Sequence, residues 1–159
     1  MKASARREEI LKYLEANHTG YTADLCRELN VSAMTIRRDF GIRLIMVPGE
    51  FNEDIRGFNG LLTTDFIQRF RIDYLFLGVN GIDAQHGLTV PDYADAETKR
   101  VLIRQSRHVI VAADHAKLGG DFFEIVARLP EIEAVVTDSG AEPSLVQELK
   151  EGGTEVILV

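Results

Sequence analysis

One stretch of the chain, residues 21–40, constrains the fold most, because it predicts two short helices joined by a tight turn. Thr22 suits the N-cap of the first helix, since its hydroxyl can accept a hydrogen bond from an otherwise unpaired backbone N–H. Asn30 tolerates the left-handed conformation that ends a helix, and Ser32 can cap the helix that follows. We therefore predict a helix-turn-helix.

The predicted second helix carries side chains that suit a DNA groove. Ile36 and Phe40 share its inner face, which leaves hydroxyl, small and basic residues to face outward. Arginine can donate two hydrogen bonds to a guanine edge or clamp a phosphate, and hydroxyls at a helix start bind phosphate. The predicted DNA-contacting residues are Thr22, Ser32, Ala33, Met34, Thr35, Arg37 and Arg38. The alternative is that the arginines form only a solvated basic face on an ordinary helical hairpin.

An upstream helix, predicted from Ser4 to about Asn17, completes a small helical head. Ile10, Leu11 and Leu14 recur there at helical spacing. These apolar side chains can close the core of a three-helix unit.

The charge of the chain is divided unevenly between this head and the rest. A net charge of −7 and a pI near 5.1 argue against a general binder of polyanions. Residues 1–40 carry a net charge of +1, whereas the remaining residues carry −8. Double-stranded DNA must therefore be contacted through the head. Because one copy makes few phosphate contacts, we expect a homo-oligomer.

Length and composition predict two domains, a helix-turn-helix DNA-binding domain at residues 1–41 and a body at residues 42–159. A chain of 159 residues with 45% hydrophobic content can bury one sizeable core. The single Cys26 excludes an intramolecular disulfide and is expected to be a packing or surface residue. No apolar run approaches the ~20 residues of a membrane helix, and no signal-peptide core follows Met1. We expect a cytoplasmic protein with no membrane partner.

The body alternates predicted strands and helices. Its strand segments are nearly continuous apolar runs, which indicate a mostly parallel sheet covered on both faces. The predicted fold class is therefore α/β. Strands are predicted at 42–47, 73–79, 109–113, 133–137 and 155–159, and helices at 63–70, 95–106 and 144–151. In the first of these helices we expect Phe66, Ile67 and Phe70 to face the core.

Polar residues follow two of these predicted strands, at the sheet edge where ligands of parallel sheets collect. They are Asn80, Gly81 and Asp83 after one strand, Asp114 and Lys117 after the next, and Glu97 and Lys99 in the helix between. The carboxylates suit sugar hydroxyls, and the lysines suit a phosphate. The alternative is that these residues are turn formers and helix caps.

No catalytic or metal-binding constellation accompanies these residues. The sequence contains no recognisable catalytic triad or Walker loop. His18, His86 and His108 are scattered without the spacing of metal ligands, and His115 fits an ordinary loop residue. We therefore expect no catalytic residue, no metal and no cofactor.

The head contains Arg6-Arg7-Glu8-Glu9-Ile10-Leu11-Lys12-Tyr13-Leu14, followed by Val31-Ser32-Ala33-Met34-Thr35-Ile36-Arg37-Arg38-Asp39. This pattern resembles the start of bacterial transcriptional regulators of the DeoR family, with Phe40 in place of the usual Leu. The resemblance implies a winged-helix-like DNA-binding head that recognises a double-stranded operator.

The body contains further motifs, in order, at residues 77–83, 87–89, 95–100, 113–119 and 135–138. They are similar in order and spacing to the C-terminal sensor of the same family. The resemblance implies a sensor like ribose-5-phosphate isomerase in fold, and a repressor of carbohydrate-metabolism genes that a phosphorylated sugar releases. The effector-binding residues that it implies are Asn80, Gly81, Asp83, Glu97, Lys99, Asp114 and Lys117.

The junction between head and body departs from the family pattern. The family continues with a basic wing and the first half of the sensor, including a phosphate-holding loop, whereas Gly41 here leads directly into a mid-sensor strand. We therefore expect an internal deletion. Loss of strands and helices would expose an apolar sheet edge and face, and would weaken binding of DNA and inducer.

Several readings of this chain remain open at the level of sequence. It can be a shortened regulator, an assembly partner of a full-length relative, or a non-functional remnant. A sugar-phosphate isomerase-like enzyme is the alternative from another class, because carboxylates and lysines follow adjacent strands.

Overall fold

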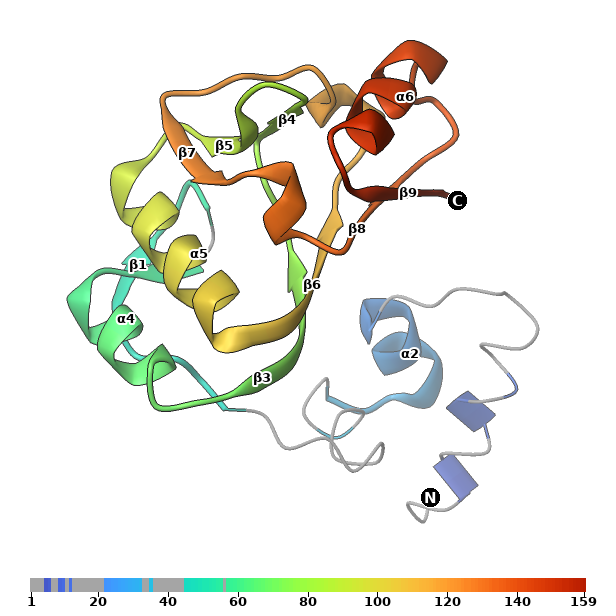
Figure 1. Ribbon diagram of the computed structural model, residues 1–159. Coiled ribbons are helices and arrows are strands. Elements are labelled where there is room, and N and C mark those ends of the chain that lie inside the picture. Colours follow the sequence, from blue (N-terminus) through green and yellow to red (C-terminus); the bar gives the residue numbers. More distant parts are fainter. Residues whose placement is uncertain are drawn as a thin grey trace. The chain divides into compact units, whose positions relative to one another are not determined.

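The computed structural model describes residues 5, 6, 9, 10, 12, 22–32, 35, 45–55 and 57–159 (Figure 1). It divides the chain into two compact units, Met1–Met46 and Val47–Val159. Each unit is described by itself.

The larger unit is built on a four-stranded parallel sheet. Its strand order is β3 (Ile72–Leu77), β6 (Ser106–Ala112), β8 (Ala134–Thr137) and β9 (Glu155–Leu158). Every neighbouring pair runs parallel. The predicted α/β class with a parallel sheet is confirmed, and these four strands lie close to their predicted positions.

Five further strands were not predicted. An antiparallel sheet contains β4 (Gly81–Asp83), β5 (Gly87–Val90) and β7 (Glu124–Ala127). A separate antiparallel hairpin contains β1 (Glu50–Asn52) and β2 (Gly57–Asn59). Strands of three or four residues are too short to show a period in the sequence.

Three helices and two single-turn 3-10 helices belong to the same unit. They are α4 (Leu61–Ile67), α5 (Tyr93–Gln105), α6 (Pro143–Glu151), η1 (His115–Lys117) and η2 (Leu129–Glu131). In the part of the chain that the structure describes, no helix is long and apolar enough to span a membrane.

Two predicted elements are corrected. The helix expected at residues 63–70 begins earlier and ends at Ile67, so that Phe70 lies at the surface while Thr63 is buried. Thr63 turns inward because its hydroxyl donates to the carbonyls of Pro48 and Asn59. The strand expected at residues 42–47 is not formed at 45–47, and its first three residues lie outside the described residues.

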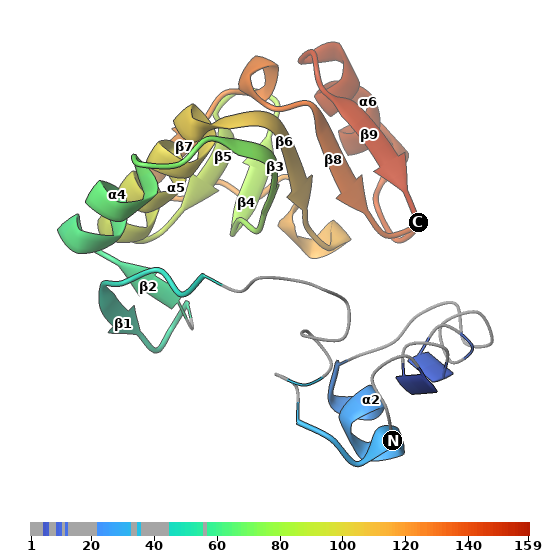
Figure 2. The same cartoon turned by 90° about the horizontal axis from the view of Figure 1, so that it is seen from below.

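The core of this unit lies on one face of the parallel sheet. Leu75, Val109, Val135 and Val156 belong to a single apolar cluster that also contains residues of α5 and α6. Figure 2 shows these two helices beside the sheet. On the opposite face Tyr74 and Phe76 of β3 and Ile157 of β9 are exposed. The expectation of a sheet covered on both faces is therefore wrong for Val47–Val159, whereas the expected exposed apolar face is present.

The smaller unit contains α2 (Thr22–Leu29). Ile10 is buried and packs against Cys26, Leu29 and Val31. Asn30 adopts the left-handed conformation, with φ of 48°, and the carbonyl of Cys26 accepts from the N–H of Val31 at 3.1 Å. This helix end follows the sequence expectation for Asn30.

Candidate functional site

A hollow of about 450 Å³ opens beyond the carboxyl end of β3. It lies between the β1–β2 hairpin and α5, where ligands of parallel α/β sheets bind. Its lining residues are Asp54, Ile55, Gly57, Phe58, Leu77, Gly78, Val79, Asn80, Asp95, Thr98, Lys99 and Leu102. Polar groups and apolar walls are both present, as a ligand with hydroxyls and a carbon skeleton requires.

The polar centre of this hollow is the ion pair between Lys99 and Asp95. The two residues are four apart on α5, and their side chains are 14% and 6% exposed. Asp92 sets the start of the helix, because its carboxylate accepts from the backbone N–H of Asp95 at 2.7 Å. An ammonium has three donors, so Lys99 can hold Asp95 and still donate to a ligand.

Arg100, the residue after Lys99, connects α5 to β7. Its guanidinium donates to the carbonyl of Ile125 at 2.9 Å and to the carboxylate of Glu124 at 2.7 Å, and it also pairs with Glu97. Burial opposes the positive charge, but hydrogen bonds from the guanidinium to Glu124 and Glu97 raise the pKa of Arg100. The helix that carries Lys99 is thereby held in place.

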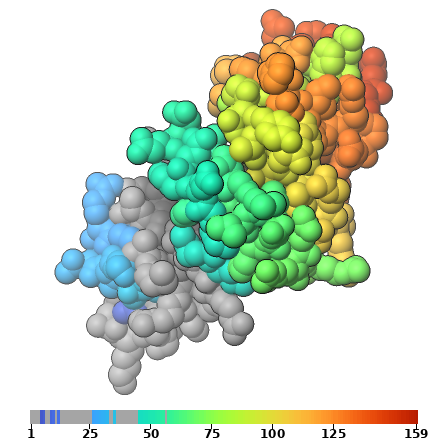
Figure 3. Space-filling model, turned by 90° about the vertical axis from the view of Figure 1, so that its left-hand side faces the viewer, coloured from blue at the N-terminus to red at the C-terminus, as the bar shows by residue number. Residues whose placement is uncertain are grey.

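Of the seven predicted effector-binding residues, Asn80 and Lys99 line this hollow. Gly81 follows directly as the first residue of β4. Glu97 lies elsewhere: it lines a second hollow of about 290 Å³ between α4 and α5, on the flank shown in Figure 3. The structure therefore brings two of the seven side chains together and turns Glu97 away.

Asp114 and Lys117 lie at the carboxyl end of β6 and are not lining residues of this hollow. The carboxylate of Asp114 accepts from the backbone N–H of Ala116 at 3.1 Å and caps η1. Beside it, backbone hydrogen bonds from His115 and Gly140 lower the pKa of Asp138 to about 2. These contacts tie the end of β6 to the end of β8.

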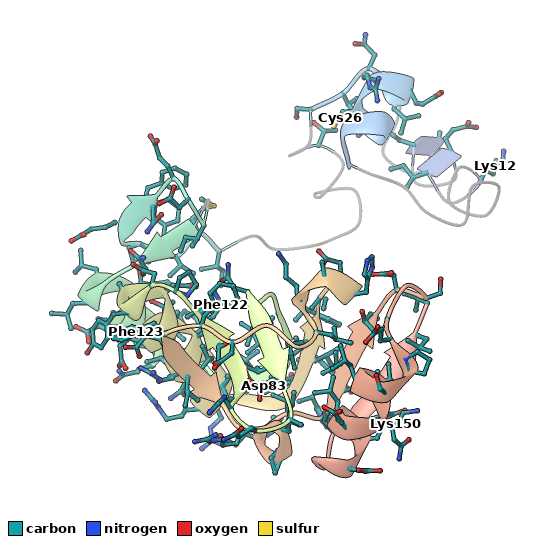
Figure 4. All side chains as sticks on the ribbon, turned by 90° about the horizontal axis from the view of Figure 1, so that it is seen from above. Lys12, Cys26, Asp83, Phe122, Phe123 and Lys150 are labelled. Carbon is teal, nitrogen blue, oxygen red and sulfur yellow. The ribbon has the colours of Figure 1, made fainter. Side chains whose placement is uncertain are left out.

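Asp83 is also placed apart from the hollow. One carboxylate oxygen accepts from the backbone N–H groups of Gln85 at 2.6 Å and His86 at 2.7 Å. Its other oxygen lies 3.3 Å from Nδ1 of His86. Asp83 thus shapes the turn between β4 and β5, where Figure 4 labels it.

Sequence reasoning missed part of the hollow. The missed lining residues with polar or apolar side chains are Asp54, Ile55, Phe58, Leu77, Val79, Asp95, Thr98 and Leu102. For Asp95, Thr98 and Leu102 the sequence did hold a signal. Together with Lys99 they are spaced three and four residues apart, which places them on one helix face. For the hairpin residues no such signal exists.

The predicted DNA-contacting residues belong to the smaller unit, where the description is partial. The hydroxyl of Ser32 accepts from the backbone N–H of Thr35 at 3.2 Å, as a helix N-cap does. α2 begins at Thr22 itself. The remaining predicted contacts, Ala33, Met34, Arg37 and Arg38, lie outside the described residues.

Comparison with known proteins identifies the family of the chain. The model of the DeoR C-terminal sensor domain matches residues 3–139. The chain belongs to this family of sensor domains.

Three curated relatives have names that describe regulators. The glycerol-3-phosphate regulon repressor of Escherichia coli is 34% identical over 142 residues, which are 89% of this chain and 55% of that protein. The transcriptional repressor AccR of Agrobacterium fabrum is 36% identical over 66% of this chain and 41% of its own length. The HTH-type transcriptional repressor GlcR of Bacillus subtilis is 30% identical over 74% of this chain and 45% of its own. The chain spans about half the length of the curated relatives that it matches.

Proposed function

We propose that this chain is a DNA-binding transcriptional regulator, a repressor of carbohydrate-metabolism genes that a phosphorylated sugar releases from its operator. The observation that carries the proposal is its membership in the DeoR sensor family, together with the repressor names of its relatives. Such a protein would act in the cytoplasm.

The hollow beside Lys99 supports the sensing part of this proposal. Lys99 would bind the phosphate as a point charge, while Asn80, Asp95 and Asp54 would accept from sugar hydroxyls. Phe58 and Leu102 offer apolar walls for the carbon skeleton. We further propose that the body has the fold of ribose-5-phosphate isomerase.

The head would supply the contacts to DNA. We propose a helix-turn-helix at residues 1–41, in which α2 is the first helix of the motif and Arg37 and Arg38 lie on the second. Two arginines per copy bind few phosphates, so the working form would be a homo-oligomer on a double-stranded operator. We also propose that an internal deletion separates the head from the body, as the sequence predicts.

Capture of fragmented genomic DNA by the purified full chain, at two salt concentrations, tests the proposal. We expect enrichment of a few promoter regions and loss of that enrichment in Arg37→Ala/Arg38→Ala. Arg69→Ala/Arg71→Ala removes the same charge from exposed positions of the body and should leave the enrichment unchanged. If Arg37→Ala/Arg38→Ala enriched the same promoter regions as the unchanged chain, the head would not be the part that binds DNA.

The same capture, repeated with sugar phosphates, tests the sensing part. Glycerol 3-phosphate is the first compound to add, because one relative is named for its regulon, and pentose and hexose phosphates follow. Loss of a charge-assisted hydrogen bond costs about 1.5–3 kcal/mol. In Lys99→Gln, release of the captured DNA should therefore need about tenfold or more sugar phosphate. Glutamine keeps a donor for Asp95, and Lys150→Gln on α6 is the matched surface control. Release that is equal in all three proteins would remove Lys99 from the effector site.

A further inference from the structure

We propose that Asp83, His86 and Asp121 bind a divalent transition-metal ion of the Zn²⁺ type. Oδ2 of Asp83 lies 3.3 Å from Nδ1 of His86, and Oδ2 of Asp121 lies 3.4 Å from the same nitrogen. The three ligand atoms all lie within 4.8 Å of one another. This cluster is separate from the hollow at Lys99, so the proposal does not depend on the proposed function.

The two shorter distances match the edges of a tetrahedral site. With metal–ligand bonds of about 2.0–2.1 Å, tetrahedral ligand atoms lie about 3.3–3.4 Å apart. The two carboxylate oxygens lie within 4.8 Å of each other, and Asp121, whose side chain is 55% exposed, can turn to complete the third edge. One imidazole and two carboxylates are ligands that Zn²⁺ and its neighbours in the first transition row accept.

The backbone holds the two ligand-bearing segments together without the metal. The N–H of Gly119 donates to the carbonyl of Ile82 at 2.7 Å, next to Asp83. A side chain at Gly81 would place its Cβ 2.3 Å from the carbonyl oxygen of Gly120, so the segments touch at glycine. The loop bearing Asp121 is thus fixed against the strand bearing Asp83, although the two residues are far apart in sequence.

The ligand atoms are also oriented for a cation. Because one oxygen of Asp83 is occupied by the backbone N–H groups of Gln85 and His86, the other faces the imidazole. A bound metal would take the lone pair on Nδ1 of His86, and the ring proton would reside on Nε2. The imidazole is partly exposed, which leaves a path for the ion and a position for water.

Comparison with the other described histidines distinguishes this cluster from an ordinary ion pair. His108 lies 2.6 Å from Glu133, and His115 lies 2.8 Å from Asp138. Each of these imidazoles pairs with a single carboxylate in the part of the chain that the structure describes. Only His86, among the three, lies between carboxylates from two separate segments.

Titration of the metal-free full chain with Co²⁺, read by its visible absorption, tests the proposal, with Zn²⁺ added afterwards as competitor. We expect one equivalent of Co²⁺ to give the strong absorption of a four- or five-coordinate ion, and Zn²⁺ to abolish it. An ion-pair cluster with no affinity for metal gives only the weak spectrum of hydrated Co²⁺, which would overturn the proposal.

Single substitutions locate the site. Replacing residues that merely orient a ligand already costs about 10–100-fold in metal affinity, so His86→Gln and Asp121→Asn should each cost about tenfold or more. Both side chains are partly exposed, and neither change disturbs the core. His108→Gln is the matched control and should keep full affinity. Equal affinity in His86→Gln and His108→Gln would show that the ion binds elsewhere.

Discussion

At the residue scale, Asp138 is held by more hydrogen bonds than its exposed position requires. Its carboxylate accepts from the backbone N–H of His115 at 2.8 Å and of Gly140 at 2.9 Å. The imidazole of His115 lies 2.8 Å from the same carboxylate. The backbone bonds favour the charged form, which lowers the pKa of Asp138 from 3.8 to about 2.

We expect this carboxylate to contribute to the acid sensitivity of the protein. Because its folded pKa is depressed, its stabilising contribution is complete above the ordinary value and is lost as pH falls through about 2. Melting temperatures measured from about pH 5 to about pH 2 should fall less steeply in Asp138→Asn than in the unchanged chain. Asp73→Asn, whose carboxylate pairs with the side chain of Arg107, is the control. An unchanged slope in Asp138→Asn would contradict the prediction.

Only part of the candidate site could be predicted residue by residue. Asn80 and Lys99, which line the hollow, were predicted because Asn80 follows a strand and Lys99 lies in the next helix, at the sheet edge where ligands collect. Glu97 was predicted with them but does not line this hollow, because residues two apart along a helix do not face the same way. The positions of Asp54 and Phe58 depend on the β1–β2 hairpin, and the strands of this hairpin are too short to show a period in the sequence.

At the element scale, α5 joins two parts of the larger unit. Lys99 faces the hollow, whereas Arg100, the next residue, donates to β7. The side chain of Arg100 is 24% exposed and that of Glu124 is 18% exposed, so both charges are largely removed from water. Such a pair is strongly destabilising to break, because the remaining charge is left without its partner.

We therefore expect Arg100→Met to destabilise the unit by about 1–3 kcal/mol, since it leaves a carbonyl and a carboxylate unsatisfied. Arg107→Met is the control, because Arg107 and Asp73 form an ion pair in which both side chains are mostly exposed. Such surface pairs contribute about 0–1 kcal/mol. Urea unfolding of the two variants measures the difference, and equal losses of stability would contradict the assigned role of Arg100.

The elements differ in how well the sequence predicted them. The strands of the parallel sheet and helices α5 and α6 were found, because long apolar runs and helical spacing mark them. The antiparallel sheet was missed, since each strand has only three or four residues. Its turn at Gly87 needs a φ of 80°, and a Cβ there would lie 2.2 Å from the carbonyl oxygen of Ala127. The close approach of Gly87 to Ala127 arises only from tertiary packing, so the sequence alone does not predict it.

At the scale of the whole molecule, the larger unit leaves one sheet face open. Tyr74 is 59% and Phe76 70% exposed on β3, and Ile157 is 40% exposed on β9. Parallel sheets are almost always covered on both faces, and contiguous apolar surface promotes association. We therefore expect the chain to self-associate as its concentration rises.

Phe76→Lys should weaken this self-association. Burying a phenylalanine contributes about 1.5–3 kcal/mol, so its loss corresponds to about a tenfold or larger change in association constant. Phe123→Lys makes the same change at a residue that is 85% exposed outside the parallel sheet, and it is the control. Light scattering over a concentration series measures both variants. If Phe123→Lys had the larger effect, the open sheet face would not be the surface involved.

The order of the strands along the chain has a consequence for folding kinetics. The chain forms β3 of one sheet, then β4 and β5 of the other, returns for β6, crosses again for β7, and ends with β8 and β9. Neither sheet is a continuous stretch of sequence, so neither can be completed until the chain has crossed between them. Such non-local pairing folds on the order of milliseconds to seconds rather than microseconds. The parallel sheet and the three-stranded antiparallel sheet are therefore expected to form, and to be lost, together.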